Sequence, residues 1–422
     1  MNITFQNNSI NSLHLKSFRK FKEVNIEFNP GINFIVGPNG SGKTSILRAI
    51  AICLSDESLD DSRWGIDSEI WIDFTYNNEQ FRLGRDTGWG KVKNYREVDV
   101  VSYNAPKSLE GRKTFHPTDY YNKEEQLPAF SPLFIGAFRK IDYHRVDGMA
   151  RENSVLERRK HYRRSAALSL NGTSLPNLKQ WLVNRYFIIE KDWAVIEKIN
   201  WEWLINNLKF IAPKGSNFYF KEIGRNLEPI FILNEQEAYL EELSAGFQSI
   251  LSIIFSIFEW VESISYDEDR VAQNSRGTVI IDEIDVHLHP EWQLTIVDSL
   301  RTFFPNLQFI ITTHSPHVIA TARKEEVIIL SNKETMDLKP LKNTFSGWTT
   351  DQILEDVMDV SSLENKKYSQ LIEEAYKFLS IGDKVRLEHS INEIQKTVHP
   401  NDTIIEVLKI QLAKLILETD EE

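Results

Sequence analysis

The feature that most constrains this chain is the stretch GPNGSGKT, which lies between an apolar run, GINFIVG, and a segment with helical periodicity, GKTSILRAIAICLS. Every fixed position of the pattern G-x-x-x-x-G-K-[ST] is present, in the strand–loop–helix context that the pattern requires. Glycines let backbone N–H groups turn inward around phosphate oxygens, and the start of the following helix adds a favourable dipole. The lysine then reaches the β- and γ-phosphates, and the threonine hydroxyl binds Mg²⁺. The sequence therefore predicts a site for a nucleoside triphosphate and Mg²⁺. Its residues are Gly37, Pro38, Asn39, Gly40, Ser41, Gly42, Lys43 and Thr44.

A second constraint is the stretch TVIIDEIDVHLHPEW, in which a β-branched apolar run ends abruptly in two carboxylates. Taken alone, it allows a dedicated metal site, a hydrolytic acid/base pair or a solvated turn. The dedicated metal site would use Asp282, Asp285, His287 and His289. A phosphate-loop enzyme needs a second strand that ends in a carboxylate holding Mg²⁺, and this favours the hydrolytic pair. Asp282 then belongs to the metal shell, Glu283 orients or deprotonates the attacking water, and His289 caps a helix that opens at Pro290.

Size and composition are those of an ordinary globular protein. The chain has 422 residues, of which 41% are hydrophobic and 26% charged, and this length is enough for two or three compact units. No apolar run approaches the roughly 20 residues of a membrane-spanning helix, and the N-terminus lacks the basic-then-apolar pattern of a signal peptide. The single cysteine, Cys53, excludes an intrachain disulfide and fits a reducing compartment. We therefore expect a cytoplasmic protein without a membrane partner.

Strand-like apolar segments alternate with helical ones along the chain, and this alternation predicts an α/β fold with a parallel-rich sheet. A long, charged and mainly helical insertion separates the phosphate loop from the acidic strand end. We predict an N-terminal part of the nucleotide-binding head at residues 1–135 and the insertion at 136–235. The C-terminal part of the head then occupies residues 236–345, and a C-terminal helical region occupies 346–422.

Two further segments indicate the class of phosphate-loop protein. ELSAGFQS precedes a long apolar helix pattern, and IITTHSP is a buried-strand pattern that ends at a histidine. In this order, with the phosphate loop and the acidic pair, the segments resemble the ABC-type ATPase superfamily. Leu243, Ser244 and Gly246 match its LSGGQ-like signature, and His314 matches its switch histidine. Taken alone, LSAGF also reads as a helix start capped by Ser244.

The resemblance implies an ABC-type ATPase head that works as a head-to-tail dimer, with ATP and Mg²⁺ at the shared interface. Each ATP would lie between the phosphate loop, acidic pair and histidine of one chain and the signature of the other. The residues so implied are Lys43, Thr44, Asp282, Glu283 and His314 on one side and Ser244 and Gly246 on the other. Hydrolysis would reopen the pair, so that ATP acts as a conformational clamp.

The sequence departs from the pattern of transporter ATPases, and these departures indicate a different branch of the superfamily. Ile284 follows Glu283 where transporter ATPases usually have proline, and no conventional Q-loop glutamine is evident, although Arg139 lies near where one would fall. DEIDVHLHPEWQ, THSP and LSAGFQS instead resemble the SMC/OLD-type AAA-family ATPases of bacterial phage defence, and among them the ATPase subunit of Septu systems, including versions attached to retrons. This resemblance implies a regulatory ATPase. Its partners would be further copies of itself, an HNH-type nuclease and, in a retron, a reverse transcriptase with its DNA or RNA.

One basic stretch, ERRKHYRRS, packs six basic residues around Tyr162. It predicts either a contact with phosphate backbones or a solvated helix face, balanced by the acidic majority that gives the chain its net charge of −12. The residues of a nucleic-acid contact would be Arg158, Arg159, Lys160, Arg163 and Arg164. The alternative function is therefore a stand-alone DNA-processing ATPase of the SMC or RecF-like type. Because no nuclease signature is present, we expect any cutting of nucleic acid to be done by another chain.

Overall fold

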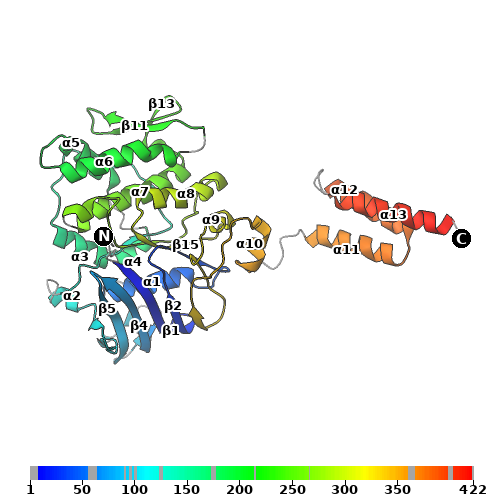
Figure 1. The fold of residues 1–422 in the computed structure, drawn as a ribbon, viewed down its shortest axis with the longest axis horizontal. Helices are drawn as coiled ribbons and strands as arrows, with labels where there is room; N and C mark the ends of the chain where they lie inside the picture. Colours follow the sequence, from blue (N-terminus) through cyan, green and yellow to red (C-terminus); the bar gives the residue numbers. More distant parts are fainter. Residues whose placement is uncertain are drawn as a thin grey trace, which may run out of the picture. The chain divides into compact units, whose positions relative to one another are not determined.

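In the computed structural model, the described residues are 8–55, 64–89, 92–94, 97–98, 102–122, 127–172, 177–212, 215–265, 267–359, 366–397 and 403–420. The chain packs into two units, Met1–Asp359 and Val360–Glu422. Figure 1 draws the ribbon with colours that follow the sequence. The phosphate loop and the acidic strand end both belong to the first unit.

The first unit contains a five-stranded parallel sheet of short, buried strands. Its strand order is β10–β14–β15–β3–β16, and all neighbouring strands run parallel. Parallel strands are covered on both faces and read as continuous apolar runs, and INFIV, TVII and QFIIT are buried at every position. This sheet confirms the predicted α/β fold. Its strands are β3 (Ile32–Val36), β10 (Leu133–Ile135), β14 (Thr278–Ile281), β15 (Gln308–Thr312) and β16 (Val327–Ile329).

A second, mainly antiparallel sheet has the order β17–β2–β1–β4–β5–β8, and β9 pairs with β5. The alternating apolar residues of its first two strands face each other across the ladder, where Leu13 pairs with Ile26 and Leu15 with Val24. Such alternation is typical of strands with one buried face. The strands are β1 (Ser9–Phe18), β2 (Phe21–Glu27), β4 (Trp64–Tyr76), β5 (Glu79–Trp89), β8 (Ser102–Asn104), β9 (Lys113–Phe115) and β17 (Thr335–Leu338), and β6 (Val92–Asn94) pairs with β7 (Glu97–Val98).

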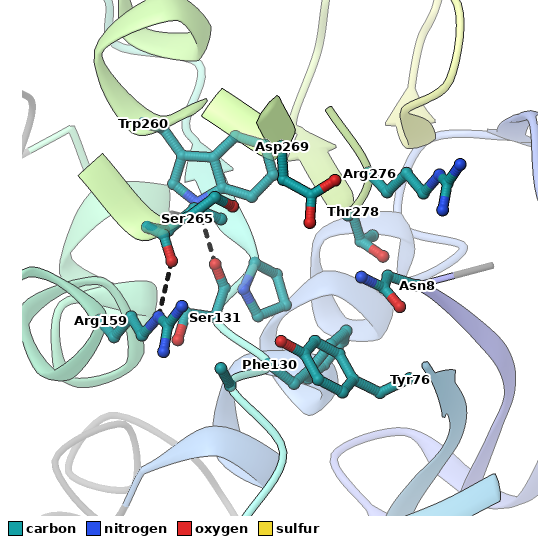
Figure 2. Close-up of a pocket in the computed structure, with 14 residues that line it drawn as sticks. Asn8, Tyr76, Phe130, Ser131, Arg159, Trp260, Ser265, Asp269, Arg276 and Thr278 are labelled. Atoms are coloured by element: carbon teal, nitrogen blue, oxygen red, sulfur yellow. Dashed lines mark hydrogen bonds between the residues drawn. The ribbon is translucent and has the colours of Figure 1, made fainter. Parts of the chain in front are cut away.

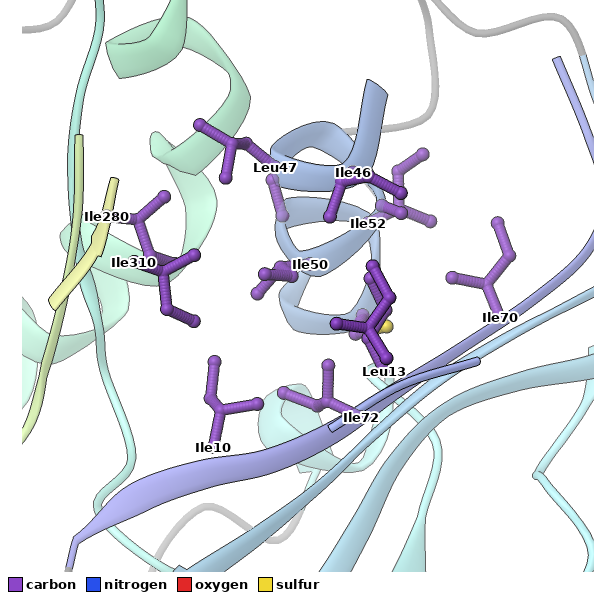
Figure 3. Packing of buried hydrophobic residues seen from close by; sticks show 14 of the residues in the cluster. Ile10, Leu13, Ile46, Leu47, Ile50, Ile52, Ile70, Ile72, Ile280 and Ile310 are labelled. Atoms are coloured by element: carbon purple, nitrogen blue, oxygen red, sulfur yellow. The ribbon is translucent and has the colours of Figure 1, made fainter. Parts of the chain in front are cut away.

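Helix α1 (Lys43–Leu54) lies between the two sheets and forms the centre of the core. Figure 3 shows Ile50 of this helix between Ile310 of the parallel sheet and Ile72 of the second sheet. All three side chains are fully buried. Because α1 begins where the phosphate loop ends, its packing also fixes the position of that loop.

Replacement of Ile50 by alanine should lower the free energy of unfolding by about 2–5 kcal/mol, because it removes buried methyl and methylene groups and leaves a cavity between the sheets. Thermal unfolding of the purified variant measures this loss. Leu294→Ala is the matched control, since Leu294 on α8 (Pro290–Phe303) is 45% exposed and should lose little. Equal stability of the two variants would contradict the central place of α1.

The predicted insertion contains helices and also a three-stranded antiparallel sheet, in the order β11–β12–β13. Asn234 and Glu235, which join the last two of these strands, have φ values of +51° and +69°, as a two-residue hairpin turn requires. One short helix, α2 (Asp119–Asn122), precedes this region. The elements of the region and those that follow it are α3 (Val155–Arg164), α4 (Ala166–Leu170), α5 (Leu178–Ile188), α6 (Val195–Asn207), β11 (Phe218–Ile223), β12 (Pro229–Leu233), β13 (Gln236–Tyr239), α7 (Ala245–Ile264), α9 (Pro316–Ala320) and α10 (Thr350–Asp356), with short 3₁₀ turns at Leu208–Phe210, Leu240–Glu242 and Asp267–Arg270.

Helix α7 is buried along almost its whole length. Among the described helices it alone is long and apolar enough to cross a membrane by length and composition, and 94% of its apolar window is buried inside the fold. The expectation that no apolar segment reaches such a length is therefore wrong for α7. The reason is physical: a helix covered on all sides by a large core needs the same composition as a membrane span.

The second unit consists of α11 (Lys366–Ser380), α12 (Lys384–Thr397) and α13 (Ile404–Asp420). These helices share a small core of their own, formed by Ala375, Leu387, Ile391, Ile394 and Leu408. The predicted helical character of the C-terminal region is confirmed.

Candidate functional site

Separate segments of the chain meet at one edge of the parallel sheet. Gly37 follows β3, Asp282 follows β14, Thr313 follows β15 and Gly136 follows β10. The carboxyl ends of parallel strands share an edge, and in open α/β sheets ligands bind there. The sheet therefore gathers the phosphate loop, the acidic pair and the histidine segment, which the sequence placed far apart.

The phosphate loop has a backbone that favours glycine at its two ends. Gly37 has a φ of +147° and Gly42 a φ of +99°, in a range that L-residues rarely adopt. A Cβ at Gly37 would lie 2.0 Å from the carbonyl oxygen of Leu330, and one at Gly42 would lie 2.5 Å from the ring of Phe21. The hydroxyl of Ser41 is buried and has no hydrogen-bond partner among the described residues. A tight loop with an orphaned buried polar atom fits a phosphate ligand.

Two lysines donate to carbonyl oxygens of the loop. The Nζ of Lys43 lies 2.8 Å from the oxygen of Gly37 and 3.1 Å from that of Pro38. The Nζ of Lys20 lies 2.8 Å from the oxygen of Gly40. Burial lowers the pKa of Lys43 from its ordinary value, and burial also lowers the pKa of Lys20. Sequence reasoning missed Lys20, for which the only signal was the basic turn in SFRKFK.

The carboxylate of Asp282 is held between the phosphate-loop helix and the neighbouring strand. The hydroxyl of Thr44 donates to its Oδ2 at 3.0 Å, and the hydroxyl of Thr312 donates to its Oδ1 at 2.5 Å. Thr312 also accepts a 2.7 Å hydrogen bond from the backbone N–H of Glu283. Hydroxyl and carboxylate oxygens are the hard ligands that Mg²⁺ prefers, so the residues at this position fit the predicted ion.

The backbone of Glu283 is strained, and Arg139 holds it. Glu283 has a φ of +48°, which costs free energy in a residue other than glycine. The guanidinium of Arg139, 2% exposed, donates to the carbonyl oxygens of Asp282 at 2.9 Å and Glu283 at 2.8 Å. Its Nε donates to the hydroxyl of Ser249 on α7 at 2.9 Å. Burial lowers the pKa of Arg139 to about 10. One buried arginine therefore joins the acidic strand end to α7.

Asp285 positions the histidine segment. Its Oδ1 accepts hydrogen bonds from the hydroxyl of Thr313 at 2.5 Å and from the backbone N–H of His314 at 3.1 Å. Loss of solvation, and next the positive charge of Lys43, lower the pKa of His314 from its ordinary value. Because that ordinary value is about 6.5, the shift favours the neutral form of the imidazole near pH 7.

The dedicated metal site that the acidic stretch also allowed is not formed. The carboxylate of Asp285 accepts hydrogen bonds from the histidine segment. His289 caps α8, because its ring accepts a 3.4 Å hydrogen bond from the backbone N–H of Glu291. Pro290 occupies the first position of that helix. Within the part of the chain that the structure describes, no group of three His, Cys, Asp or Glu side chains could hold a metal ion. The predicted cap is confirmed, and the dedicated metal-site interpretation is wrong because its donors serve separate local contacts.

The signature residues lie at the start of α7. Ser244 is the N-cap, whose hydroxyl accepts a 3.4 Å hydrogen bond from the N–H of Phe247. A Cβ at Gly246 would lie 2.7 Å both from the carbonyl oxygen of His287 and from the ring of Trp292, so this glycine allows close packing. In the described part of one chain, neither signature residue hydrogen-bonds to the phosphate loop. Their contact with a nucleotide of a second chain stays a prediction.

Two arginines of the basic stretch on α3 are used inside the fold. Arg163 is 3% exposed and donates to the hydroxyl of Ser131 at 2.8 Å. Arg158 pairs with Glu152 at 3.0 Å and with Glu259 at 3.5 Å. The nucleic-acid interpretation is therefore wrong for Arg163, because its side chain is buried. For Arg158, which is half-buried and ion-paired, a contact with nucleic acid stays a prediction.

The other three residues of the basic stretch are half-buried or exposed. Arg159 is half-buried and donates through Nε to the carbonyl oxygen of Ile264 at 2.6 Å. Lys160 is half-buried and Arg164 is exposed. A contact of these residues with nucleic acid stays a prediction.

Comparison with known proteins defines the class. The family model described as "AAA domain, putative AbiEii toxin, Type IV TA system" matches residues 32–320. The chain therefore belongs to this family of AAA domains, and it is an ATPase.

Individual relatives indicate which kind of ATPase the chain resembles. The chain is 26% identical over 423 residues to the Septu protein PtuA of Bacillus thuringiensis, covering 96% of this chain and 98% of that protein. It is 30% identical over 252 residues to the "Retron Ec83 probable ATPase" of Escherichia coli, covering 58% of this chain and 44% of that protein. These similarities confirm the resemblance to Septu and retron ATPases. The solved structure of an SMC head domain from Thermotoga maritima aligns with a TM-score of 0.43 and 16% sequence identity, covering 79% of this chain and 99% of that domain. Because this TM-score is low, the fold class is assigned from the sheet topology.

Replacement of Arg139 by alanine should lower the free energy of unfolding by about 2–5 kcal/mol, because it leaves buried carbonyl oxygens without a donor. Arg139→Lys should recover only part of the loss, since an ammonium group cannot replace the planar fork of donors. Urea unfolding measures both variants. Arg145→Ala is the control, because the Arg145 side chain is 80% exposed. Wild-type stability of Arg139→Ala would show that other contacts hold the Glu283 backbone.

Proposed function

We propose that this chain is the ATP-hydrolysing regulatory subunit of a bacterial antiphage defence complex in the cytoplasm. The observation that carries the proposal is the similarity to a Septu protein over 96% of this chain and 98% of that protein. This similarity extends beyond the ATPase head to the insertion and the C-terminal helices. The sheet edge supports the chemistry, since it brings together a phosphate loop, two carboxylates and a histidine.

The nucleotide site is built from the phosphate loop and the acidic strand end. Residues 37 and 39–42 surround the phosphates with backbone N–H groups, and Lys43 binds the β- and γ-phosphates. Thr44 and Asp282 hold Mg²⁺, which neutralises charge on the phosphates when it is bound. The support for this assignment is the direct hydrogen bond between Thr44 and Asp282, which shows that the two side chains face the same small volume.

Glu283 is the general base. Its carboxylate accepts a proton from the attacking water, the water oxygen bonds to the γ-phosphorus, and the bond to the leaving oxygen of ADP breaks. Lys43 and His314 stabilise the charge on the transferred group. The support is that the backbone of Glu283 is held from both sides, at its N–H by Thr312 and at its carbonyl by Arg139.

A second copy of the chain completes the site in a head-to-tail dimer. Ser244 and Gly246, at the start of α7, contact the nucleotide that the partner copy binds. The support is the exposure of Ser244 at the N-terminus of a 20-residue helix, where backbone N–H groups and the helix dipole favour an anion.

Glu283→Gln should lower the rate of ATP hydrolysis by about a hundredfold or more, because general base catalysis typically contributes that much, while ATP binding is retained. Lys43→Ala should weaken ATP binding itself. Phosphate release and equilibrium binding of a fluorescent ATP analogue measure the two effects. Glu190→Gln, at an exposed position just after α5, is the control. Hydrolysis by Glu283→Gln at the wild-type rate would remove this residue from the role of base.

The chain that cuts nucleic acid is a separate subunit, an HNH-type nuclease, joined in a retron by a reverse transcriptase with its DNA or RNA. The support is the resemblance to Septu and retron ATPases, together with a sequence that shows no nuclease signature. ATP binding by the dimer would then control the nuclease. In other nucleotide-dependent switches, the γ-phosphate likewise holds one conformation, which is lost when the nucleotide is hydrolysed.

Purification of the Glu283→Gln chain with ATP from its native genetic setting should recover a nuclease. Mass spectrometry and nucleic-acid extraction of the eluate identify what travels with it, and a reverse transcriptase or short DNA would place the complex in a retron. Recovery of only a dimer on long DNA would favour the alternative, a stand-alone SMC or RecF-like DNA-processing ATPase. Mg²⁺-dependent DNA cutting by the purified chain alone would contradict the regulatory role.

A further inference from the structure

A cavity of about 560 Å³ lies beside the C-terminal end of α7. Figure 2 shows Phe130 and Trp260 on its walls. Both rings are buried in the core, and Arg159 already donates to the carbonyl oxygen of Ile264 at 2.6 Å. The cavity therefore presents few free groups to a ligand, whereas the outer surface of the insertion presents several.

Three large apolar side chains lie on the surface of α6 and of the turn that precedes it. Trp193 is 69% exposed, Val195 59% and Ile199 41%. Val195 and Ile199 are four residues apart, so they lie one above the other on the same face of α6. The opposite face, which contains Trp201 and Leu204, is buried. Single exposed apolar residues are common, but a group that includes a tryptophan is typical of an interaction surface. We call Trp193, Val195 and Ile199 the α6 patch.

The backbone beside Trp193 is held in a tight turn between α5 and α6. The N–H of Lys191 donates to the carbonyl oxygen of Ile188 at 2.8 Å, and the N–H of Ala194 donates to that of Lys191 at 2.9 Å. Ala194 is fully buried next to the exposed tryptophan. A large side chain on an ordered backbone loses little conformational freedom on binding, which favours association.

The charged residues beside the α6 patch carry both signs. Lys198 and Glu202 are exposed, and neither side chain has a hydrogen bond or ion pair within the described ranges. Because they are four residues apart, they lie on the same flank of the line formed by Val195 and Ile199. In an antiparallel pair of α6 helices with a two-fold axis close to Ile199, Lys198 of each copy faces Glu202 of the other. The surface is therefore complementary to itself.

We propose that the α6 patch binds the same patch on a second copy of the chain, in an antiparallel α6–α6 contact with two-fold symmetry. A second copy covers the apolar side chains and pairs both charges, which a partner of a single charge sign cannot do. Figure 1 shows α6 on the other side of α7 from β1 and β4. The contact does not use ATP, and the inference does not rest on the proposed function. Where ATP also forms head-to-tail dimers, the two contacts together join them into larger assemblies.

Sedimentation equilibrium of the full chain without nucleotide tests the contact. The wild type should dimerise at micromolar concentration. Ile199→Asp should weaken dimerisation about a hundredfold or more, and Trp193→Ala about tenfold or more, because each removes a central apolar side chain of the contact. Leu294→Asp is the matched control, since Leu294 on α8 is exposed to a similar extent, and it should dimerise as the wild type does.

Reversal of the charges tests the antiparallel register. Lys198→Glu and Glu202→Lys should each weaken dimerisation about tenfold, because each places like charges opposite one another on both sides of the two-fold axis. A mixture of these two variants should restore association as a heterodimer, in which every one of these side chains faces an opposite charge. A folding defect cannot be repaired by mixing.

A wild type that stays monomeric at high micromolar concentration would overturn the proposal, and so would a surface that another protein covers while the chain itself stays monomeric. Dimerisation that Ile199→Asp and both charge reversals leave unchanged would also overturn it. Because these measurements contain no nucleotide, failure of the proposed head-to-tail dimer would not alter their outcome.

Discussion

The burial of helix α1 between two sheets is the interaction on which the rest of the structure depends. Its apolar residues share one core with strands of the parallel sheet and of the antiparallel sheet. Because the helix begins at Lys43, the same packing places the phosphate loop, and the close approaches of Gly37 to Leu330 and of Gly42 to Phe21 show how tightly the surroundings close on it. Hydrophobic burial of α1, which is non-directional, thereby positions the polar phosphate loop, although that loop has few large side chains of its own.

At the acidic strand end, polar contacts instead of hydrophobic burial hold the backbone, and that backbone is strained. The left-handed φ of Glu283 costs free energy, and the hydrogen bonds from Arg139 and to Thr312 offset that cost. Since Arg139 also binds Ser249 on α7, a movement of that helix relative to β14 would strain the same contacts. The geometry of the proposed base is therefore coupled to the helix whose first turn carries the predicted dimer contact.

The sequence by itself determined the chemistry that depends on neighbouring residues. The stretch GPNGSGKT predicted a strand–loop–helix unit, and VIIDE predicted a buried strand ending in carboxylates, because glycine conformation, apolar runs and helix starts are local properties. The cap at His289 before Pro290 was predicted for the same reason. The alternation of strands and helices was enough to predict an α/β fold with a parallel sheet.

Only the tertiary structure decided which distant residues meet these local elements. Arg139 contacts the carbonyl oxygen of Glu283, a residue 144 positions away, and no spacing rule connects the two. Arg163 belongs to a basic run typical of a surface, yet it is buried because Ser131 and the ring of Tyr120 lie against it. Sequence reasoning did not find that α7 is long and apolar enough to cross a membrane, and 94% of its apolar window is buried inside the fold. Periodicity and composition indicate that a face is covered, whereas the partner that covers it is chosen by the folding of the whole chain.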